Sequence, residues 1–208
     1  GAGVEAIEGA GRAERVRLAG GRVLDCAAVL VGVGVAPRTE LAEAAGIPVR
    51  DGVLVDATLA SGVPGVFAAG DVASALHPFT GGRVRVEHWA NALNQGPAAA
   101  RAMLGAGKPY DRLPYFFSDQ FDLGMEYTGF GRPEHELVLR GDPAGRELVA
   151  FWLDGGRVTA GLTVNVWGLT DRVQALVRAR VPVDRDRLRD PGVPLDDLLP
   201  AGAAGERS

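Results

Sequence analysis

The run over residues 66–71, Val-Phe-Ala-Ala-Gly-Asp, constrains the fold most, because it stays apolar until it ends on a glycine and an aspartate. A short, continuous apolar run predicts a strand that is buried on both faces of a parallel sheet. Residues 27–34 form a second run of this kind. Doubly wound parallel sheets bind their ligands at the carboxyl ends of the strands. The sequence therefore predicts an α/β segment with Asp71 at such an edge.

Asp71 has two interpretations that the residues alone do not separate. Gly70 frees the backbone before it, so the carboxylate at a strand end can accept hydrogen bonds from a sugar-like hydroxyl. Alternatively, Asp71 is a solvated residue that caps the turn at Val72 and Ala73.

Composition excludes several classes of function. The 208 residues are 47% hydrophobic and 23% charged, which is typical of a globular chain with a buried core. A net charge of −4 indicates a chain that does not bind nucleic acid, and no apolar run reaches the roughly 18 residues of a membrane helix. Cys26 is the only cysteine, so a redox-active cysteine pair is absent and a reducing compartment is expected. His77, His88 and His135 are too irregularly spaced to predict a metal site.

Short elements joined by glycine-rich turns are expected before residue 110. Alternation of apolar and polar residues begins at Val4, so we expect the chain to be a fragment of a longer protein or a processed product, or to represent only part of the protein. Thr39 is expected to cap a short helix, and Pro97 to disturb a longer one. The expected strands cover residues 4–8, 14–18, 22–24 and 52–56, and the expected helices cover residues 40–45 and 90–104.

The residues after 110 are predicted to form a separate domain rich in strands. It opens on an aromatic strand, residues 114–120, which the pattern alone favours as part of a hydrophobic core. Asp154-Gly155-Gly156 predicts a hairpin turn. Thr170 or Asp171 is expected to cap a helix. The other expected elements are strands at 123–130, 135–140, 147–153 and 156–164, the helix at 169–179, and an apolar anchor at 195–199 within the polar tail 184–208.

Two glycine-containing segments resemble nucleotide-binding loops to different degrees. Residues 1–6 match the letters of a dinucleotide fingerprint, but no strand precedes them and no helix follows, so this match is rejected. Residues 32–37, Gly-Val-Gly-Val-Ala-Pro, follow a predicted strand and precede a predicted helix. Their glycines would let another backbone or a ligand approach closely. The final proline departs from the fingerprint and favours a tight strand-to-helix crossover.

The segment Glu87-His88-Trp89-Ala90-Asn91 opens the predicted helix at 90–104. A helix N-terminus presents free N–H groups and a partial positive charge, which favour an electron-rich ligand. The alternatives are that Glu87 and Asn91 only cap the helix, that Trp89 is a core residue, and that His88 is an ordinary surface or core histidine.

Taken in order, these motifs resemble the FAD-dependent ferredoxin reductase family, within the pyridine nucleotide-disulfide oxidoreductase superfamily. The resemblance extends over nearly the whole chain. Each motif is modest, and their ordered occurrence is specific. The matching segments are V-L-V-G-V-G-V-A-P (29–37), G-V-L-V-D (52–56), V-F-A-A-G-D-V-A (66–73), E-H-W-A-N-A (87–92), P-Y-F-F-S-D-Q (114–120) and V-P-L-D-D-L-L (193–199).

The resemblance implies three parts. Residues 1–30 look like the end of an NAD(P)H-binding domain, and residues 31–109 look like the C-terminal part of an FAD-binding domain. Residues 110–208 look like the reductase C-terminal domain. The fold class implied is a partial α/β segment of the FAD/NAD(P)-binding type followed by an α+β domain.

The resemblance also implies which residues bind the cofactor FAD. The family's Gly-Asp pair falls on Gly70 and Asp71, whose carboxylate would hold the flavin ribitol. Trp89, preceded by Glu87 and His88, would lie near the pyrimidine end of the ring. Phe117 would pack beside the isoalloxazine. Tyr115 and Phe117 stand where tryptophans are frequent in the family, so an indole N–H donor is lost at both positions.

The implied activity is that of a cytoplasmic NAD(P)H:ferredoxin oxidoreductase of an oxygenase system. Electrons would pass from NAD(P)H through FAD to a [2Fe–2S] ferredoxin or a similar small redox protein. Both glycine-rich nucleotide fingerprints are missing here, so the chain alone is expected to be inactive and to need the remainder of the reductase. Alternatives are another acceptor (rubredoxin, a nitrite reductase partner or oxygen) and a non-enzymatic docking or dimerisation fragment without flavin.

Five arginines have two interpretations. They would form a surface for an acidic ferredoxin, or they are scattered solvated side chains, which is the more common arrangement. These residues are Arg83, Arg85, Arg172, Arg178 and Arg180.

Overall fold

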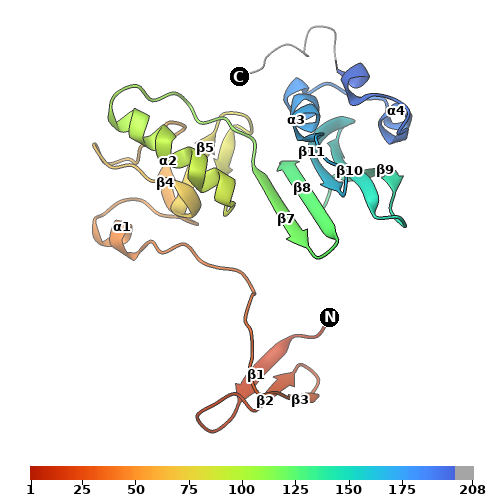
Figure 1. The fold of residues 1–208 in the computed structure, drawn as a ribbon. Coiled ribbons are helices and arrows are strands. Elements are labelled where there is room, and N and C mark those ends of the chain that lie inside the picture. The colour runs from red at the N-terminus through yellow and green to blue at the C-terminus, as the bar shows by residue number, and fades with distance from the viewer. Residues whose placement is uncertain (200–208) are drawn as a thin grey trace. The chain divides into compact units, whose positions relative to one another are not determined.

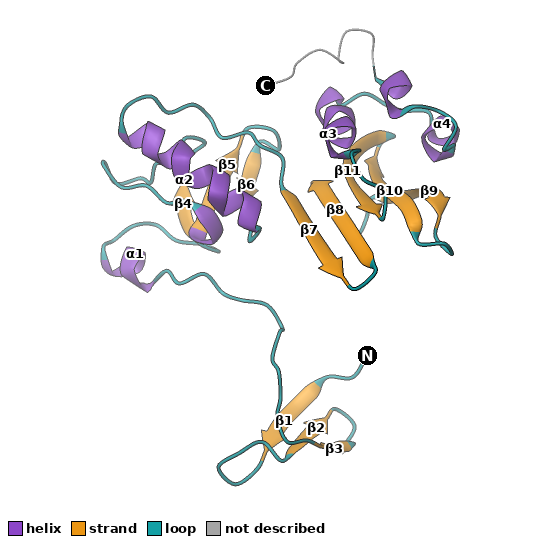
Figure 2. Cartoon of the chain, viewed as in Figure 1, coloured by secondary structure: helices purple, strands orange, loops and turns teal. Residues whose placement is uncertain are grey.

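A computed structural model describes residues 1–199 of the chain. The chain divides into two compact units, one of residues 1–36 and one that begins at Pro37. The first unit is an antiparallel sheet in the strand order β1-β2-β3 (Figure 1; strands are orange in Figure 2). Its strands, β1 (Val4–Glu8), β2 (Arg15–Leu18) and β3 (Val23–Asp25), confirm the three strands expected from the alternating sequence.

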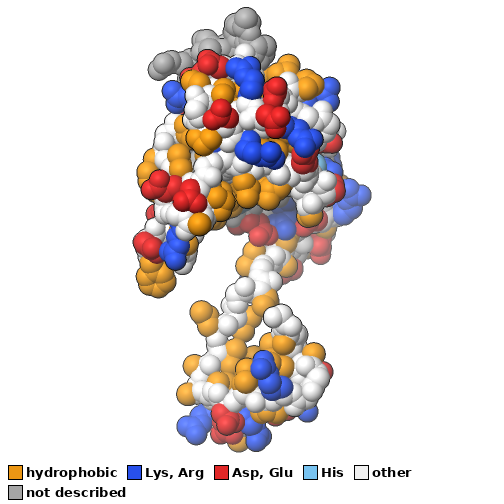
Figure 3. All heavy atoms as spheres, turned by 90° about the vertical axis from the view of Figure 1, so that its right-hand side faces the viewer, with side chains coloured by type: hydrophobic (Ala, Val, Ile, Leu, Met, Phe, Trp, Pro, Cys, Tyr) orange, Lys and Arg blue, Asp and Glu red, His pale blue; other side chains and the backbone are white. Residues whose placement is uncertain are grey.

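The predicted strand over residues 27–34 is wrong. These residues have no strand or helix, and the side chains of Leu30 and Val33 are 98% and 90% exposed. Hydrophobic side chains along this extended segment stand uncovered in Figure 3. A strand needs a neighbour that pairs with its backbone, and no strand among residues 1–199 pairs with this run. Nor do residues 32–37 form a tight crossover, since the space beside Gly32 and Gly34 is open.

The second unit begins with a small mixed sheet. Strand β4 pairs in parallel with β5, and β5 pairs antiparallel with β6. Val55, Leu59 and Ala73 lie in the core of this region, together with Ala99 from the long helix α2. The elements are α1 (Glu40–Ala44), β4 (Val53–Val55), the 3₁₀ turn η1 (Gly70–Val72), β5 (Ala73–His77), β6 (Gly82–Val84) and α2 (Trp89–Met103).

The apolar run over residues 66–71 is not a buried strand either. Within residues 1–199 its one ladder contact is an isolated bridge between Ala60 and Phe67. The Ala68 N–H donates to the Leu59 carbonyl of the preceding loop. Strand β5 begins two residues after Asp71. The aspartate therefore precedes a strand instead of ending one, in the turn η1.

Helix α2 continues through Pro97 without a break. Proline removes one donor, and the carbonyl that loses it is that of Leu93, four residues earlier. The Leu93 side chain is 57% exposed, so this carbonyl lies toward the solvent side of the helix. The alanine-rich sequence around it has high helix propensity, which offsets the missing hydrogen bond.

The C-terminal part is an antiparallel sheet in the order β7-β8-β11-β10-β9, covered on one face by α3 and flanked by α4 and the turn η2 (Figure 2). Phe151, Val138 and Val177 lie fully buried between sheet and helices. The elements are β7 (Tyr115–Gln120), β8 (Leu123–Gly129), β9 (Glu136–Asp142), β10 (Glu147–Asp154), β11 (Arg157–Val164), α3 (Thr170–Ala179), α4 (Arg185–Arg189) and η2 (Leu195–Leu198).

Local chemistry explains most of this domain. The pairing of Asp154 with Arg157 leaves Gly155 and Gly156 as a two-residue hairpin loop, and both have positive φ, as a type I′ turn requires. The apolar anchor at Leu195 to Leu199 is confirmed, whereas residues 200–208 of the predicted tail lie outside the described residues. The expected cap of α3 is wrong, because Leu169 occupies the N-cap position.

The architecture is a mixed α/β segment followed by an α+β domain. No helix within residues 1–199 is long and apolar enough to cross a membrane. The same residues hold no group of three or more metal-ligating side chains that would bind an ion.

Candidate functional site

The turn at Gly70 and Asp71 is anchored on helix α2. Gly70 has φ +78°, and a Cβ atom at this position would lie 3.4 Å from the Cβ of Ala92. Its N–H donates a buried hydrogen bond of 2.8 Å to Oε1 of Gln95. Glycine is therefore favoured by the backbone conformation, whereas an added Cβ would only reach ordinary contact distance of the helix. The result is that Asp71 is held beside the first turns of α2 with an exposed side chain.

Arg85 joins the other side of this turn to the segment before α2. Its guanidinium donates to the Asp71 carbonyl at 3.3 Å, to Glu87 Oε1 at 2.6 Å and to Asp51 Oδ1 at 2.8 Å. The hydrogen bond to Glu87, together with that to Asp51, raises the pKa of Arg85 against the opposing effect of burial. Glu87, one of the predicted cofactor residues, thus has its carboxylate engaged by Arg85.

His88 occupies the N-cap position of α2 with an extended backbone. Its ring lies against Phe116 of β7, with 4.8 Å between the ring centroids. Burial lowers the pKa of His88, and the negative charges of Asp71 and Glu87 oppose that shift. Its Nδ1 atom is buried and has no hydrogen-bond partner within residues 1–199. Buried polar atoms are normally paired, so Nδ1 marks a place where another polar group fits.

Trp89 opens helix α2 and leaves most of its indole, 72%, exposed. The helix start is fixed by Asn91, whose Nδ2 donates to the Val86 carbonyl at 3.2 Å. The first N–H groups of a helix have no partner inside the helix and carry a partial positive charge. An exposed aromatic face and free N–H donors therefore lie together at this end of α2.

Phe117 lies on the edge strand β7 with its side chain 53% exposed. Strand alternation sends it to the face opposite that of Phe116. Phe116 continues from His88 into an aromatic row, stacking on Tyr127 at 5.1 Å, and Tyr127 contacts Trp152 at 5.7 Å. The structure therefore joins Gly70, Asp71, Glu87, His88 and Trp89 around one end of α2, and it is Phe116, not Phe117, that touches this group.

On the other face of β7, Tyr115 shares Glu126 with the start of α3. The Tyr115 hydroxyl donates to Glu126 Oε1 at 2.7 Å, and Thr170 donates to Oε2 at 3.1 Å. Burial and the hydrogen bond to Glu126 raise the pKa of Tyr115 to about 12. Thr170 therefore ties α3 to the sheet and does not cap its own helix.

The sequence does not predict Gln95, Phe116 or the contacts that Arg85 makes at this site. Arg85 and Gln95 carry no local signal, because their partners lie up to 34 residues away in the chain. Period-2 alternation indicates that only one of Phe116 and Phe117 can face a given side, but it does not indicate which of them faces helix α2.

The five arginines considered for an acidic partner are engaged within the chain. Arg83 donates to the carbonyls of Val55 and Ser74. Arg180 lies over the ring of Phe79 at 4.0 Å. The remaining three, Arg85, Arg172 and Arg178, form ion pairs with Asp51 and Glu87, with Asp196, and with Asp111.

The residues at this end of α2 fit a flavin. The exposed carboxylate of Asp71 suits the hydroxyls of such a ligand. The free helix N–H groups and the unpartnered Nδ1 of His88 suit its electron-rich ring edge. The exposed indole suits its aromatic plane. The positive φ of Gly70 gives the turn the course that places Asp71 beside the helix.

Comparisons with known proteins agree on one family. A family model described as pyridine nucleotide-disulphide oxidoreductase matches residues 1–96, and one described as reductase C-terminal matches residues 115–199. The chain is 42% identical over 204 residues to the 5,5'-dehydrodivanillate O-demethylase ferredoxin reductase subunit of Sphingobium sp., covering 96% of this chain and 49% of that protein. It is 39% identical to the ferredoxin–NAD(+) reductase component of the anthranilate 1,2-dioxygenase system of Burkholderia cepacia, covering 82% and 42% of the two chains.

Solved structures give the same result. A ferredoxin reductase from Rhodopseudomonas palustris superposes with a TM-score of 0.88 at 32% identity, covering 95% of this chain and 49% of that one. The covalent putidaredoxin reductase–putidaredoxin complex superposes with a TM-score of 0.85 at 30% identity, covering 99% and 50%. The chain thus spans about half the length of the relatives it matches.

Proposed function

Because this chain belongs to the FAD-dependent ferredoxin reductases of the pyridine nucleotide-disulphide oxidoreductase superfamily, we propose that it forms the flavin-contacting and C-terminal part of an NAD(P)H:ferredoxin oxidoreductase. When bound, FAD would accept a hydride from NAD(P)H and release electrons singly to a [2Fe–2S] ferredoxin of an oxygenase system. The remainder of the reductase would supply the nucleotide-binding loops that this chain lacks.

The single observation that carries the proposal is the anchoring of Asp71 beside the first turn of α2, through the Gly70 N–H bond to Gln95. The Asp71 carboxylate would accept hydrogen bonds from the hydroxyls of the ribitol chain. The free N–H groups at Trp89 would stabilise negative charge at the ring edge, and the Trp89 indole would exclude water from it. His88 would offer Nδ1 to a polar group of the ligand.

Phe117 and Glu87 enter the proposal in lesser roles. Glu87 would act through Arg85, which it holds at 2.6 Å, and so would set the position of the Asp71 backbone. The exposed ring of Phe117 would form an apolar wall beside the cofactor site from the edge of the sheet. The proposed domain boundaries are residues 1–30, 31–109 and 110–208.

A ferredoxin partner is supported by the names of the relatives and by the solved reductase–putidaredoxin complex. We also propose that the protein acts without binding a nucleic acid or a membrane. We place the reaction in the cytoplasm, which fits the unpaired Cys26 and the use of NAD(P)H.

The test is the variant Asp71→Asn in the full-length reductase that contains this chain. Losing charge-assisted hydrogen bonds to the ribitol should weaken FAD binding about tenfold or more, measured by flavin absorbance after dialysis and by titration with FAD. Asp154→Asn is the matched control, because Asp154 is exposed in a hairpin far along the chain. If both variants retain flavin equally, the assigned role of Asp71 is wrong.

A further inference from the structure

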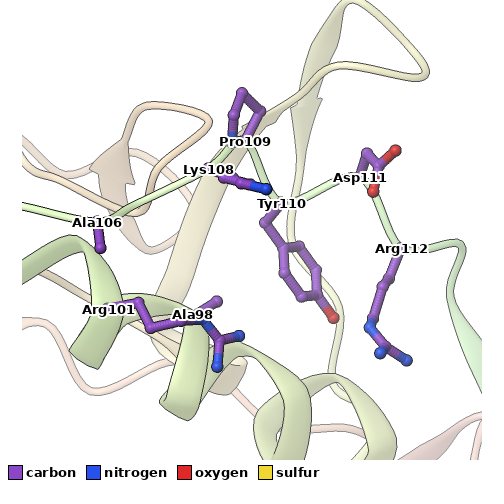
Figure 4. A pocket seen from close by; sticks show the side chains of 8 residues that line it. All are labelled: Ala98, Arg101, Ala106, Lys108, Pro109, Tyr110, Asp111 and Arg112. Carbon is purple, nitrogen blue, oxygen red and sulfur yellow. The ribbon is translucent and has the colours of Figure 1, made fainter. Parts of the chain in front are cut away.

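A cavity of about 300 Å³ lies between the last turns of α2 and the loop that leads into β7 (Figure 4). The charged and hydroxyl side chains on its wall are Arg101, Lys108, Tyr110, Asp111 and Arg112. In Figure 4 the Tyr110 ring stands between the guanidinium groups of Arg101 and Arg112. Cavities of this size accept small ligands.

The cavity wall carries an excess of positive charge. Arg101, Lys108 and Arg112 form no ion pair within residues 1–199. The one carboxylate on the wall, Asp111, lies 3.6 Å from Arg178, which lies outside the lining. The whole chain is acidic, with a net charge of −4, and its only lysine is Lys108. Three cations without an ion-pair partner therefore line one concavity, together with a carboxylate that Arg178 already engages.

The wall is held rigid by its backbone. The Tyr110 N–H donates to the Ala57 carbonyl at 2.7 Å, and the Arg112 carbonyl lies 3.0 Å from Nε2 of His77. Arg178 donates to the Asp111 carbonyl at 3.1 Å. A loop whose backbone is fixed at three successive residues keeps its course before any ligand arrives, which reduces the backbone entropy lost on binding.

The Tyr110 hydroxyl provides a neutral donor among the cations. It donates to Oδ1 of Asn91 in a long hydrogen bond of 3.4 Å, which a ligand oxygen would have to replace. Burial raises the pKa of Tyr110, so the phenol stays protonated at neutral pH. A protonated hydroxyl can donate to an oxyanion without adding charge.

We propose that this cavity binds a small molecule with adjacent oxyanion groups, of the diphosphate class. Arginine and lysine recognise phosphate oxygens through charge-assisted hydrogen bonds, and here they surround a concavity instead of spreading over a flat face. The cavity side chain Arg101 lies about 18 Å along α2 from Trp89 at 1.5 Å per residue, whereas the Tyr110 hydroxyl reaches Asn91 in the first turn of the helix.

The test is calorimetric titration of the 208-residue chain with pyrophosphate, orthophosphate and ADP at constant ionic strength. We expect one saturable site for pyrophosphate, with weaker binding of orthophosphate. ADP binding more tightly than pyrophosphate would identify a nucleotide as the source of the diphosphate, and weaker ADP binding would identify a free polyanion. Both results support the site.

The decisive variants are Arg101→Gln and Lys108→Gln. Each should weaken pyrophosphate binding about tenfold, because each removes a charge-assisted hydrogen bond. Arg50→Gln is the matched control, since Arg50 is an exposed arginine outside the cavity, and it should bind as the unmodified chain does. Circular dichroism confirms that each variant is folded.

Equal binding by all three variants would overturn the proposal, as would binding that follows ionic strength alone. Binding of an acidic ferredoxin that depends on Arg101 and Lys108, without binding of pyrophosphate, would also overturn it and assign the cavity to a protein partner. The titration contains neither flavin nor an electron acceptor, so its outcome is independent of the proposed function.

Discussion

The Nε2 atom of His77 lies 3.0 Å from the carbonyl oxygen of Arg112, and this contact ties strand β5 to the loop that enters the C-terminal sheet. The other ring nitrogen, Nδ1, accepts a hydrogen bond of 3.2 Å from the Phe79 N–H. A ring that donates from Nε2 and accepts at Nδ1 must be neutral. The His77 side chain is only 3% exposed. Burial lowers the pKa of His77, and the hydrogen bond with the Arg112 carbonyl opposes this shift.

The stability of the chain should fall as the pH drops below about 6.5, the ordinary pKa of histidine. The folded state holds His77 neutral, while the unfolded state takes up a proton first, so acid favours unfolding. The stability is fully present above that pH and is lost as the pH falls toward the folded-state pKa. Urea unfolding between pH 7.5 and 5 measures this loss.

His77→Gln should reduce that acid sensitivity, at a cost of about 1–2 kcal/mol of stability at pH 7, because one buried hydrogen bond is lost. Part of the pH dependence should remain, since burial also lowers the pKa of His88. His135→Gln is the control and should retain the full acid-side loss. An unchanged pH profile in His77→Gln would show that His77 does not control it.

Gly161→Ala should destabilise the C-terminal domain by about 1–3 kcal/mol, the usual cost of overpacking a core. A Cβ at Gly161 would lie 2.5 Å from Cγ1 of Val173, so α3 would have to move off the sheet. Gly96→Ala is the matched control, because the space beside Gly96 in α2 is open and alanine favours a helix by about 1 kcal/mol. Thermal unfolding of the two variants should show shifts of opposite sign.

Phe151→Ala should cost about 3–5 kcal/mol, because it empties the centre of the C-terminal core. Phe151 is fully buried, whereas Phe121 at the β7–β8 turn is fully exposed. Phe121→Ala removes the same atoms from the surface and should change the free energy of unfolding by less than about 0.5 kcal/mol. Similar losses from both variants, measured by chemical denaturation, would contradict the placement of this core.

Gly70→Ala should lose both stability and flavin. Gly65 and Gly70 have nearly the same backbone conformation, with φ of +79° and +78°, so alanine costs about 1–2 kcal/mol of backbone strain at either position. Only Gly70 anchors the turn beside the proposed cofactor site, through the hydrogen bond from its N–H to Gln95. Gly65→Ala in the full-length reductase should therefore keep its FAD, whereas Gly70→Ala should release it on dialysis. Equal flavin content in the two variants would exclude the proposed role of the turn.

Local patterns in the sequence predicted much of the C-terminal domain. The four strands after β7 and the Gly155-Gly156 turn follow from alternation and from the need for positive φ, both of which are local properties. The same reasoning failed at residues 27–34 and 66–71. An apolar run reports a preference for burial, but a strand also requires a neighbouring backbone, which the run itself does not supply.

The sequence by itself determined where turns and amphipathic strands lie, and which ordered motifs place the chain in its family. Only the tertiary structure decided that His88 lies against Phe116, that Gln95 anchors Gly70, and that Arg85 joins Asp51 to Glu87. The reason is physical: these contacts join residues far apart in the chain, and the partner of a charged or aromatic side chain is set by which elements pack together. A hydrophobic pattern determines which face of an element is buried, and the packing of the elements determines which residues that face contacts.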